Sequence, residues 1–491
     1  MTSLATLQFD NHFAHLGSQF SSALPPTPLP LPYLVSANPD VAALIDLDPE
    51  QLRTSEFISF VSGNWLPPGA EPVAMLYAGH QFGHFVPQLG DGRAILTGQV
   101  RNTRNQSWDL QLKGAGETPY SRMADGRAVL RSTIREYLCS EAMHHLGIPT
   151  SRAMGIVGSD FPVVRESVET AAVLLQVSPS HVRFGSFEVF FYRNQHAHLK
   201  TLADYVILQH FPEISAAPGT TASYFSFLHE VVVRTARLIA QWQTVGFAHG
   251  VMNTDNMSIL GLTFDYGPYG FMESFDPDFI CNHSDESGRY AFSSQPRIAF
   301  WNLCRLAQAL TPLLPLEQCR DALADFDSVY RETYAQLFRS KLGLLSTRDE
   351  DATLMSDLLE ILQASAVDYP MFFRALGNFD CQTDSPDADA RRLFPNPEAF
   401  GNWSMNYRTR LALEGTGEAE RQAKMRATNP RYVLRNWLVQ RAIDLAQDKD
   451  FSEVDRLLHL LRRPFDDQPG FEEYARPAPP DFLVHGVSCS S

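Results

Sequence analysis

The chain has 491 residues, of which 44% are hydrophobic, so it is long enough to bury a core in about two to four domains. Its 40 Lys and Arg residues are outnumbered by 56 Asp and Glu residues, which gives a formal net charge of −16. This acidic balance is a poor match for nucleic acid or an anionic membrane, so we expect neither as a partner. An anionic ligand would need a local basic pocket.

The N-terminal segment carries no targeting pattern. Residues 1–52 contain no Lys or Arg, so we expect neither a secretory signal nor an Arg-rich transit peptide. No apolar run reaches the length that a membrane-spanning helix needs. The 6 cysteines are few for a chain of this size, which is typical of a reducing compartment. We therefore expect a cytoplasmic protein, acting as a monomer.

A glycine-rich turn precedes two predicted strands. Gly90 and Gly92 lead into the alternating run Ala94 to Val100, and a polar stretch then turns the chain into a second strand that ends at Lys113. Glycine allows close approach, so the backbone NH groups of such a turn can cradle phosphates. Lys113 lies on the strand face opposite its leucines and is free to reach the same ligand.

A predicted amphipathic helix follows at Thr133. The spacing of Thr133 and Glu136 is typical of a capping box, and apolar residues continue at helical intervals to Leu146. Glu136 has a second interpretation, because the helix glutamate of protein kinases pairs with a strand lysine such as Lys113. The sequence leaves both interpretations open at this point.

The segment from His249 to Asn256 is similar to the catalytic loop of protein kinases. Kinases have His-Arg-Asp, four residues and Asn, followed later by Asp-Phe-Gly, and this chain has Asp265-Tyr-Gly at the later position. In that alignment Val251 replaces the aspartate that activates the hydroxyl group, and valine cannot accept a proton. Asn256 and Asp265 remain as hard oxygen ligands for a Mg²⁺ or Mn²⁺ nucleotide complex.

Each motif alone is weak, but their joint order predicts an α+β protein with a two-lobed, protein-kinase-like fold. An N-terminal extension of residues 1–75, containing the proline-rich run Leu24 to Pro32, would wrap the lobes. A small nucleotide-binding lobe would span residues 76–183, a larger and mostly helical catalytic lobe with C-terminal helical additions residues 184–465, and a tail residues 466–491.

The larger lobe shows helical periodicity over most of its length. We expect helices over Leu202–Phe211, Tyr224–Val245, Ile298–Leu310, Asp327–Leu342, Tyr432–Gln447 and Phe451–Leu461. An Asp-rich interval from Asp380 to Asp389 predicts a loop. His80 and His84 have the spacing of a zinc pair on a helix, but adjacent glycines disfavour a helix there, so we interpret both as structural.

At these motifs the chain resembles the selenoprotein O family of kinase-like protein adenylyltransferases, and the match is nearly full length. It implies an ATP bound in a flipped orientation, with AMP transferred to a Ser, Thr or Tyr hydroxyl group of another protein. The matching segments are Tyr77–Gly83, Gln88–Arg93, Lys113–Gly116, Thr118–Arg122, Asp125–Arg127, Arg135–Leu138, Ser180–Gly185, His249–Asn256, Asp265–Pro268, Cys281–Asp285 and Cys489–Ser491.

The resemblance also implies roles for individual residues. Lys113 and Arg183 would hold phosphates of the co-substrate ATP. Asn256 and Asp265 would bind Mg²⁺ or Mn²⁺, and Asp255 would be the proton acceptor that replaces the one missing at Val251. The other nucleotide contacts would come from Gly90, Gly92, Arg93, Asp125, Gly126, Glu136, Gln176 and Asp265.

One position departs from the family pattern, because the family has Arg where this chain has Gln176. Glutamine still donates a hydrogen bond but brings no charge. A charge-assisted contact worth about 1.5 to 3 kcal/mol would therefore be weakened or lost. We expect this change to affect ATP affinity or orientation and to leave the fold intact.

A pair of cysteines suggests redox control. Family members often carry selenocysteine at the position of Cys489, which implies a reactive residue, and Cys281 lies in the segment equivalent to a kinase activation loop. We hypothesise a reversible Cys281–Cys489 disulfide that restrains the active-site segment. Two unrelated thiols are the alternative, because pairing cannot be deduced from sequence.

Three other functions stay open from the sequence. The protein could transfer UMP from UTP with Mn²⁺, it could be a conventional phosphotransferase with Asp255 as its base, or it could be a non-catalytic pseudokinase that binds nucleotide. The first two differ from adenylylation in which nucleotide group reaches the protein substrate, so labelled nucleotides distinguish them.

Overall fold

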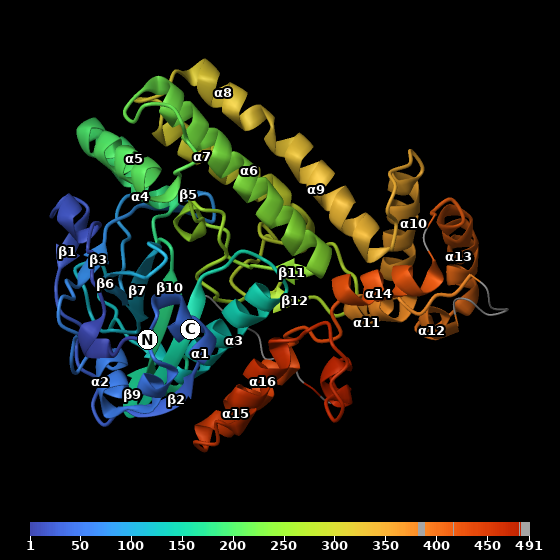
Figure 1. Ribbon diagram of the computed structural model, residues 1–491, viewed down its shortest axis with the longest axis horizontal. Coiled ribbons are helices and arrows are strands. Elements are labelled where there is room, and N and C mark those ends of the chain that lie inside the picture. Colours follow the sequence, from blue (N-terminus) through green and yellow to red (C-terminus); the bar gives the residue numbers. More distant parts are fainter. Residues whose placement is uncertain (382–387, 416, 481, 483–491) are drawn as a thin grey trace.

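The structure is a computed structural model that describes residues 1–381, 388–415, 417–480 and 482 (Figure 1). The strands of the main antiparallel sheet all lie between Ser21 and Ser178, and helices predominate after them. The molecule therefore mixes helix and sheet, as the sequence predicts. No helix in these ranges combines the length and the apolar composition that crossing a membrane requires.

The main sheet has the strand order β1-β3-β6-β7-β10-β9-β2, with β8 paired to β10. Its central hairpin, β6 and β7, confirms the two strands predicted on either side of the polar stretch. The strands are β1 (Ser21–Ala23), β2 (Tyr33–Ala37), β3 (Val73–Met75), β4 (Gly79–Gln81), β5 (His84–Val86), β6 (Ala94–Arg101), β7 (Ser107–Lys113), β8 (Ala128–Val129), β9 (Arg152–Val164), β10 (Val168–Ser178), β11 (Phe247–Ala248) and β12 (Gly270–Phe271).

The six predicted helices are present as α5, α6, α7, α9, α15 and α16. The helix predicted from Leu202 begins earlier, at His196, and the start of α15 is corrected below. In Figure 1, α6 and α9 run side by side, and α16 packs against α3. The helices are α1 (Pro39–Ala42), α2 (Ser55–Val61), α3 (Leu130–His145), α4 (Phe184–Tyr192), α5 (His196–His210), α6 (Thr221–Val245), α7 (Gln295–Ala309), α8 (Leu316–Ala324), α9 (Phe326–Lys341), α10 (Asp351–Ala364), α11 (Tyr369–Leu376), α12 (Ala388–Arg391), α13 (Pro397–Leu411), α14 (Glu418–Thr428), α15 (Asn436–Gln447) and α16 (Ser452–Leu461).

The N-terminal residues are joined to the main sheet. Strand β1 pairs with β3 at one edge and β2 pairs with β9 at the other. Between them, the NH group of Thr27 donates to the carbonyl of Ala115 (2.8 Å), and that of Leu29 donates to Ser62 (2.9 Å). Leu29 is fully buried. The proline-rich run is therefore packed into the molecule, and the division of the chain into four segments stays a prediction.

The start of α3 differs from the prediction. The helix begins at Leu130, directly after β8, so Thr133 lies inside it and its hydroxyl group donates to the carbonyl of Leu130 (2.9 Å). The predicted capping box is therefore wrong. The physical reason is that pairing of β8 with β10 fixes the chain up to Val129, and the helix starts from there.

The helix predicted from Tyr432 starts four residues later, as α15. The NH groups of Arg431 and Tyr432 both donate to the carbonyl of Pro464, at 2.8 and 3.1 Å. The Tyr432 side chain is fully buried. The apolar residues before α15 are therefore buried in the core without being helical. Over only a few positions, the spacing of apolar residues does not distinguish such a segment from a helix.

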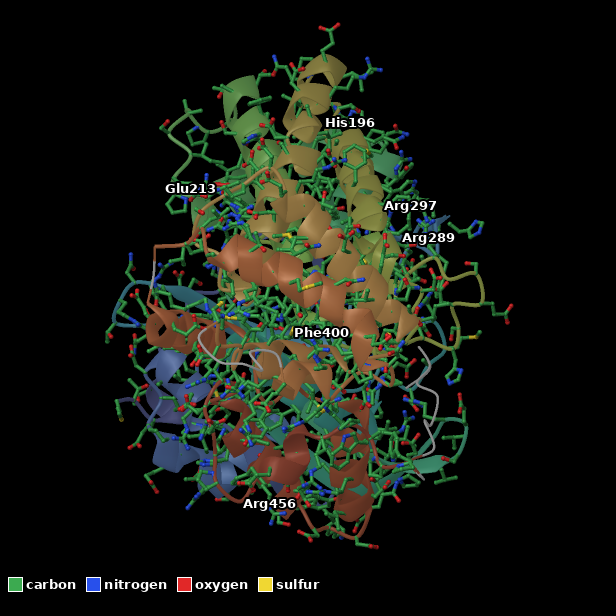
Figure 2. The ribbon with its side chains drawn as sticks, turned by 90° about the vertical axis from the view of Figure 1, so that its right-hand side faces the viewer. His196, Glu213, Arg289, Arg297, Phe400 and Arg456 are labelled. Carbon is green, nitrogen blue, oxygen red and sulfur yellow. The ribbon has the colours of Figure 1, made fainter. Side chains whose placement is uncertain are left out.

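Two apolar cores lie on opposite faces of the main sheet, and a third lies among the C-terminal helices. Along β10, Leu174 joins the core shared with α3 to α7, whereas Val173 and Leu175 join the core beneath the N-terminal segment. This alternation is the period of a strand buried on both faces. Phe400 of α13 belongs to the third core and is labelled in Figure 2.

Candidate active site

A cavity of about 590 Å³ lies between the main sheet and the loops that follow α6. Its volume is in the range of small-molecule pockets. Most of the predicted site residues line it, namely Gly90, Gly92, Arg93, Lys113, Asp125, Gly126, Arg183, Asp255, Asn256 and Asp265. Segments far apart in the sequence therefore meet at one place.

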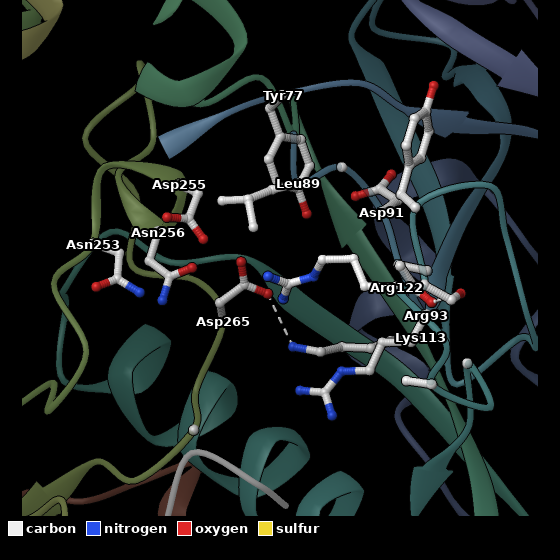
Figure 3. A pocket seen from close by; sticks show the side chains of 18 of the residues that line it. Tyr77, Leu89, Asp91, Arg93, Lys113, Arg122, Asn253, Asp255, Asn256 and Asp265 are labelled. Atoms are coloured by element: carbon white, nitrogen blue, oxygen red, sulfur yellow. Dashed lines mark hydrogen bonds and ion pairs between the residues drawn. The ribbon is translucent and has the colours of Figure 1, made fainter. Parts of the chain in front are cut away.

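The cavity has two unlike walls. Figure 3 shows Lys113 and Arg122 on one side, and Asp255, Asn256 and Asp265 on the other. The first wall carries cationic side chains, with Asp91 also on that side, and the second carries carboxylate and amide oxygens. An anionic ligand that carries a divalent cation would match both walls.

Lys113, at the end of β7, is held by two carboxylates. Its ammonium group donates to Glu136 Oε1 (2.8 Å) and to Asp265 Oδ1 (3.0 Å). Gln176 of β10 also donates to Glu136 Oε1 (2.8 Å). Glu136 and Gln176 are not among the cavity-lining residues. Of the two interpretations of Glu136, the structure supports pairing with Lys113. Gln176 contacts this pair through Glu136 and does not reach the cavity.

Asp265 is shared between two cations. Its second oxygen accepts from Arg183, with 2.7 Å between Nη1 and Oδ2. Burial alone would raise the pKa of Asp265, but the charges of Lys113 and Arg183 outweigh burial and hold that pKa well below its usual range. Asp265 has a φ of 57°, a left-handed conformation that is uncommon outside glycine. The carboxylate is thus ionised and fixed at the cavity wall.

Arg183 is itself fixed on several sides. Its guanidinium group donates to the backbone carbonyl of Asp255 (2.8 Å) as well as to Asp265. It also stacks on the rings of Tyr77 and Phe264, at 4.4 and 4.7 Å from their centroids. A buried arginine held by rings and hydrogen bonds keeps its donors in one orientation, which suits recognition of an anion.

Asp255 lies in a short 3-10 turn, η5 (Thr254–Asn256). Its Oδ2 atom accepts from Gln81 Nε2 (3.1 Å), and its Oδ1 atom has no partner among the described residues. Burial raises the pKa of Asp255 to about 7. A carboxyl group that titrates near neutral pH is well matched to proton transfer.

A hydrogen bond between Asn256 and Val251 stabilises the kinase-like loop His249–Asn256. The amide nitrogen of Asn256 donates to the backbone carbonyl of Val251 (3.0 Å). This bond leaves the amide oxygen of Asn256 for the cavity, on the same wall as Asp265 (Figure 3). Amide and carboxylate oxygens are ligands that suit Mg²⁺ or Mn²⁺, so this pair fits a divalent ion.

Packing against Tyr120 explains why glycine occupies both positions of the predicted phosphate turn, Gly90 and Gly92. A side chain at Gly90 would place its Cβ atom 2.5 Å from Tyr120 Cγ, and one at Gly92 would lie 2.9 Å from the Tyr120 carbonyl. Gly90 also has a φ of 98°. Close approach of Tyr120 therefore requires glycine here, whether or not a phosphate also binds.

The chain belongs to a known family. The family described as protein adenylyltransferase SelO matches residues 3–462. This chain is a member of that family. Over 100% of both chains, it is 55% identical to a protein named protein nucleotidyltransferase YdiU from Myxococcus xanthus and 53% identical to one of the same name from Thiobacillus denitrificans. The resemblance seen in the motifs is confirmed.

In this SelO family member, Asp125 is held by a residue that the motifs do not include. Both oxygens of Asp125 accept from Arg165, at 2.8 and 2.9 Å. The hydrogen bonds from Arg165 lower the pKa of Asp125. Arg165 lies in the turn between β9 and β10, and it also lines the cavity. No local pattern distinguishes it, because only the long hairpin brings it to this site.

Sequence reasoning also missed other cavity residues. Arg122, the buried Asp91 and Gln81 line the cavity as well, and all three lie within the matched segments although no motif assigns them a role. The side-chain oxygen Oδ2 of Asp91 accepts from the NH group of Met75 (3.0 Å), and burial raises the pKa of Asp91. The signal that could have found these residues is their position inside the matched segments.

Cys281 lies beside the loop that contains His249. It is half-buried, and its thiol donates to the carbonyl of Ala248 (3.5 Å). A side chain at Gly250 would meet its sulfur at 2.7 Å. Cys489 lies outside the described residues, so the Cys281–Cys489 disulfide stays a hypothesis.

Proposed function

We propose that this protein transfers AMP from ATP to Ser, Thr or Tyr hydroxyl groups of other proteins. Membership of the adenylyltransferase family supports this activity. The observation that carries the proposal is the place of Asp255, a buried carboxyl group beside Asn256 and Asp265 in the cavity. It supplies a proton acceptor where the kinase alignment has only Val251.

The proposed architecture is the two-lobed kinase-like fold, with residues 76–183 as the small lobe and residues 184–465 as the larger lobe. The ion pair between Lys113 and Glu136 supports it, since kinases pair a strand lysine with a helix glutamate. The order of these elements along the chain supports it as well.

ATP would bind in the flipped orientation, with its γ-phosphate toward Lys113 and Arg183. Gly90, Gly92 and Arg93 would contact the rest of the nucleotide, together with Asp125 and Gly126. Both cations contact Asp265 in the structure. Binding of the phosphates would therefore exchange one anionic partner of these cations for another, which avoids leaving a buried charge unpaired.

Asn256 and Asp265 would hold a Mg²⁺ or Mn²⁺ ion, whose chemistry when bound is to neutralise charge on the phosphates. Asp255 would take the proton of the acceptor hydroxyl group. The hydroxyl oxygen then forms a bond to the α-phosphorus, and the bond between the α-phosphorus and the oxygen that bridges to the β-phosphate breaks. The products are AMP-modified protein and pyrophosphate.

The test compares α-labelled with γ-labelled ATP on a protein substrate. Transfer of the α-label alone is the expected result. Transfer of the γ-label would instead indicate a conventional phosphotransferase. Nucleotide binding without transfer of either label would indicate a non-catalytic pseudokinase and would contradict the proposal.

Uridylylation is the second candidate. The relatives are named protein nucleotidyltransferases, which does not specify a base. The measurement is transfer from α-labelled UTP and α-labelled ATP at equal concentrations, with Mg²⁺ and with Mn²⁺. Faster transfer from UTP with Mn²⁺ would replace AMP by UMP in the proposed reaction and leave the site assignment unchanged.

A further inference from the structure

The β4–β5 hairpin is hydrogen-bonded to the segment that carries Asp255. The hairpin is part of the small lobe in sequence, while the turn comes after α6. Three hairpin donors bond to Asn253, which precedes the turn, and to its first two residues: Phe82 N to Asn253 Oδ1 (3.1 Å), His80 N to Thr254 Oγ1 (2.7 Å) and Gln81 Nε2 to Asp255 Oδ2 (3.1 Å). These hydrogen bonds hold the turn in a fixed position relative to the hairpin.

The tip of the hairpin is held in a conformation that favours this contact. Phe82 and Gly83 have φ values of 49° and 87°, the left-handed pair of a type I′ hairpin turn. A bulky residue is uncommon in this region of φ. The ring of Phe82 packs on Tyr290 (5.1 Å), whose hydroxyl group donates to Asn253 Oδ1 (2.6 Å). Contacts with the turn thus stabilise the unusual backbone.

The base of the hairpin is tied to the same turn by a buried glutamate. Glu188 of α4 is fully buried. One of its oxygens lies 2.7 Å from His80 Nδ1, and the other accepts from the hydroxyl group of Thr254 (2.5 Å). Hairpin and turn therefore share one anchor. Glycine at position 79 allows the hairpin and the turn to approach, since the Cβ atom of any other residue there would lie 2.5 Å from Asp255 Oδ1.

Within the described ranges, Gln81 is the only side chain that donates to the Asp255 carboxylate. Arg183 bonds to the backbone carbonyl of Asp255, and Asp265 bonds to cations. Gln81 and Asp255 both line the cavity, so the hydrogen bond between them lies at its wall.

We propose that Gln81 is a positioning residue for the reaction: its amide fixes Asp255 Oδ2 at the cavity wall, in line for the acceptor hydroxyl group. A carboxylate oxygen accepts more than one hydrogen bond, so the hydroxyl group can approach Oδ2 while Gln81 stays bonded. The inference rests on the proposed role of Asp255 as proton acceptor. The side-chain hydrogen bond of Gln81 goes to Asp255 and not to a residue proposed to hold phosphate or metal, so we expect its loss to affect chemistry more than nucleotide binding.

The first experiment measures kcat, KM and ATP affinity for Gln81→Leu and Gln81→Glu. Leucine removes the donor at similar volume, and glutamate keeps the shape but replaces the donor with an acceptor. We expect kcat to fall about 10- to 100-fold, the equivalent of one hydrogen bond to a charged group, with ATP affinity within about twofold of wild type.

The matched control is Gln88→Leu. Gln88 follows the same hairpin, accepts from Arg193 (3.1 Å) and does not line the cavity. This variant should keep wild-type kcat. Circular dichroism and thermal unfolding would establish that each variant is folded, and the glutamate variant keeps the test possible if the leucine variant is not.

The deciding experiment is a double-mutant cycle with Asp255→Asn, measured in single-turnover assays that resolve slow rates. If Gln81 acts through Asp255, Gln81→Leu should cause no further loss in the Asp255→Asn protein. An equal loss in both backgrounds, or wild-type kcat in both Gln81 variants, would overturn the inference alone. Absence of α-label transfer by the wild-type protein would overturn the proposed function as well.

Discussion

Lys113 and Lys341 are both buried, with 7% and 4% of their surface exposed, but their surroundings are opposite. Lys113 contacts two carboxylates, Glu136 and Asp265. Lys341, the last residue of α9, lies over the ring of Phe373, with 4.1 Å between its Nζ atom and the ring centroid. No ion pair to Lys341 occurs within the part of the chain that the structure describes.

The difference shows that burial of a cation does not mark a functional site by itself. Burial lowers the pKa of Lys341 to about 7, which favours its neutral form in the folded protein. Lys113 instead keeps acidic partners, one of which lines the cavity. A buried cation that is held by carboxylates at a cavity remains available to exchange them for a phosphate.

The largest expected effect comes from removing the carboxylate that Lys113 and Arg183 share. Asp265→Ala should lower AMP transfer at least about a thousandfold, because it removes a proposed metal ligand and the anion between two cations. Asp160→Ala is the control, since Asp160 forms an exposed ion pair with Lys449. Transfer of α-label at the wild-type rate by Asp265→Ala would refute the site assignment.

The same substitution at both lysines tests the comparison directly. Lys113→Met should weaken ATP binding about 10- to 100-fold, the equivalent of a lost charge-assisted hydrogen bond. Lys341→Met should leave ATP binding unchanged. Isothermal titration calorimetry of both variants measures this, and equal losses would mean that the two lysines do not differ in function.

A smaller effect is expected at Gln176, which contacts Glu136 and not the cavity. Gln176→Arg should tighten ATP binding by about tenfold, because a new cation beside Glu136 leaves Lys113 freer to bind a phosphate. The gain should be smaller for AMP, which lacks the γ-phosphate. Equal tightening of ATP and AMP in calorimetry would show that this position does not act on the γ-phosphate.

Lys341→Met should have the smallest effect on activity. It should, however, change the stability of the protein in a pH-dependent way. The unfolded lysine is protonated up to about pH 10, whereas the folded one has a pKa of about 7, so folding releases a proton between these values. The native lysine therefore lowers stability most at and below pH 7. Thermal unfolding should show a gain in Tm for the variant at pH 6.5 that shrinks at pH 9.5. A gain that grows with pH would contradict the assigned environment.

Much of the fold could be predicted from local patterns. The β6–β7 hairpin and helix α6 follow apolar periodicity that neighbouring residues alone create. Of the two interpretations of Glu136, the structure supports pairing with Lys113, because the two side chains are hydrogen-bonded (2.8 Å). It contradicts the capping box, because α3 begins at Leu130, ahead of Thr133. The capping box failed at that point, since strand pairing outweighs a local cap.

The sequence by itself determined the family, the order of the elements and most of the predicted site residues that line the cavity, because these depend on residue types at fixed spacing. Only the tertiary structure decided that Gln81 meets Asp255, that Arg165 holds Asp125 and that Gln176 lies behind Lys113. These contacts join segments that are 40 or more positions apart in the chain. Such contacts depend on how the hairpins and helices pack together, which no spacing within a motif encodes.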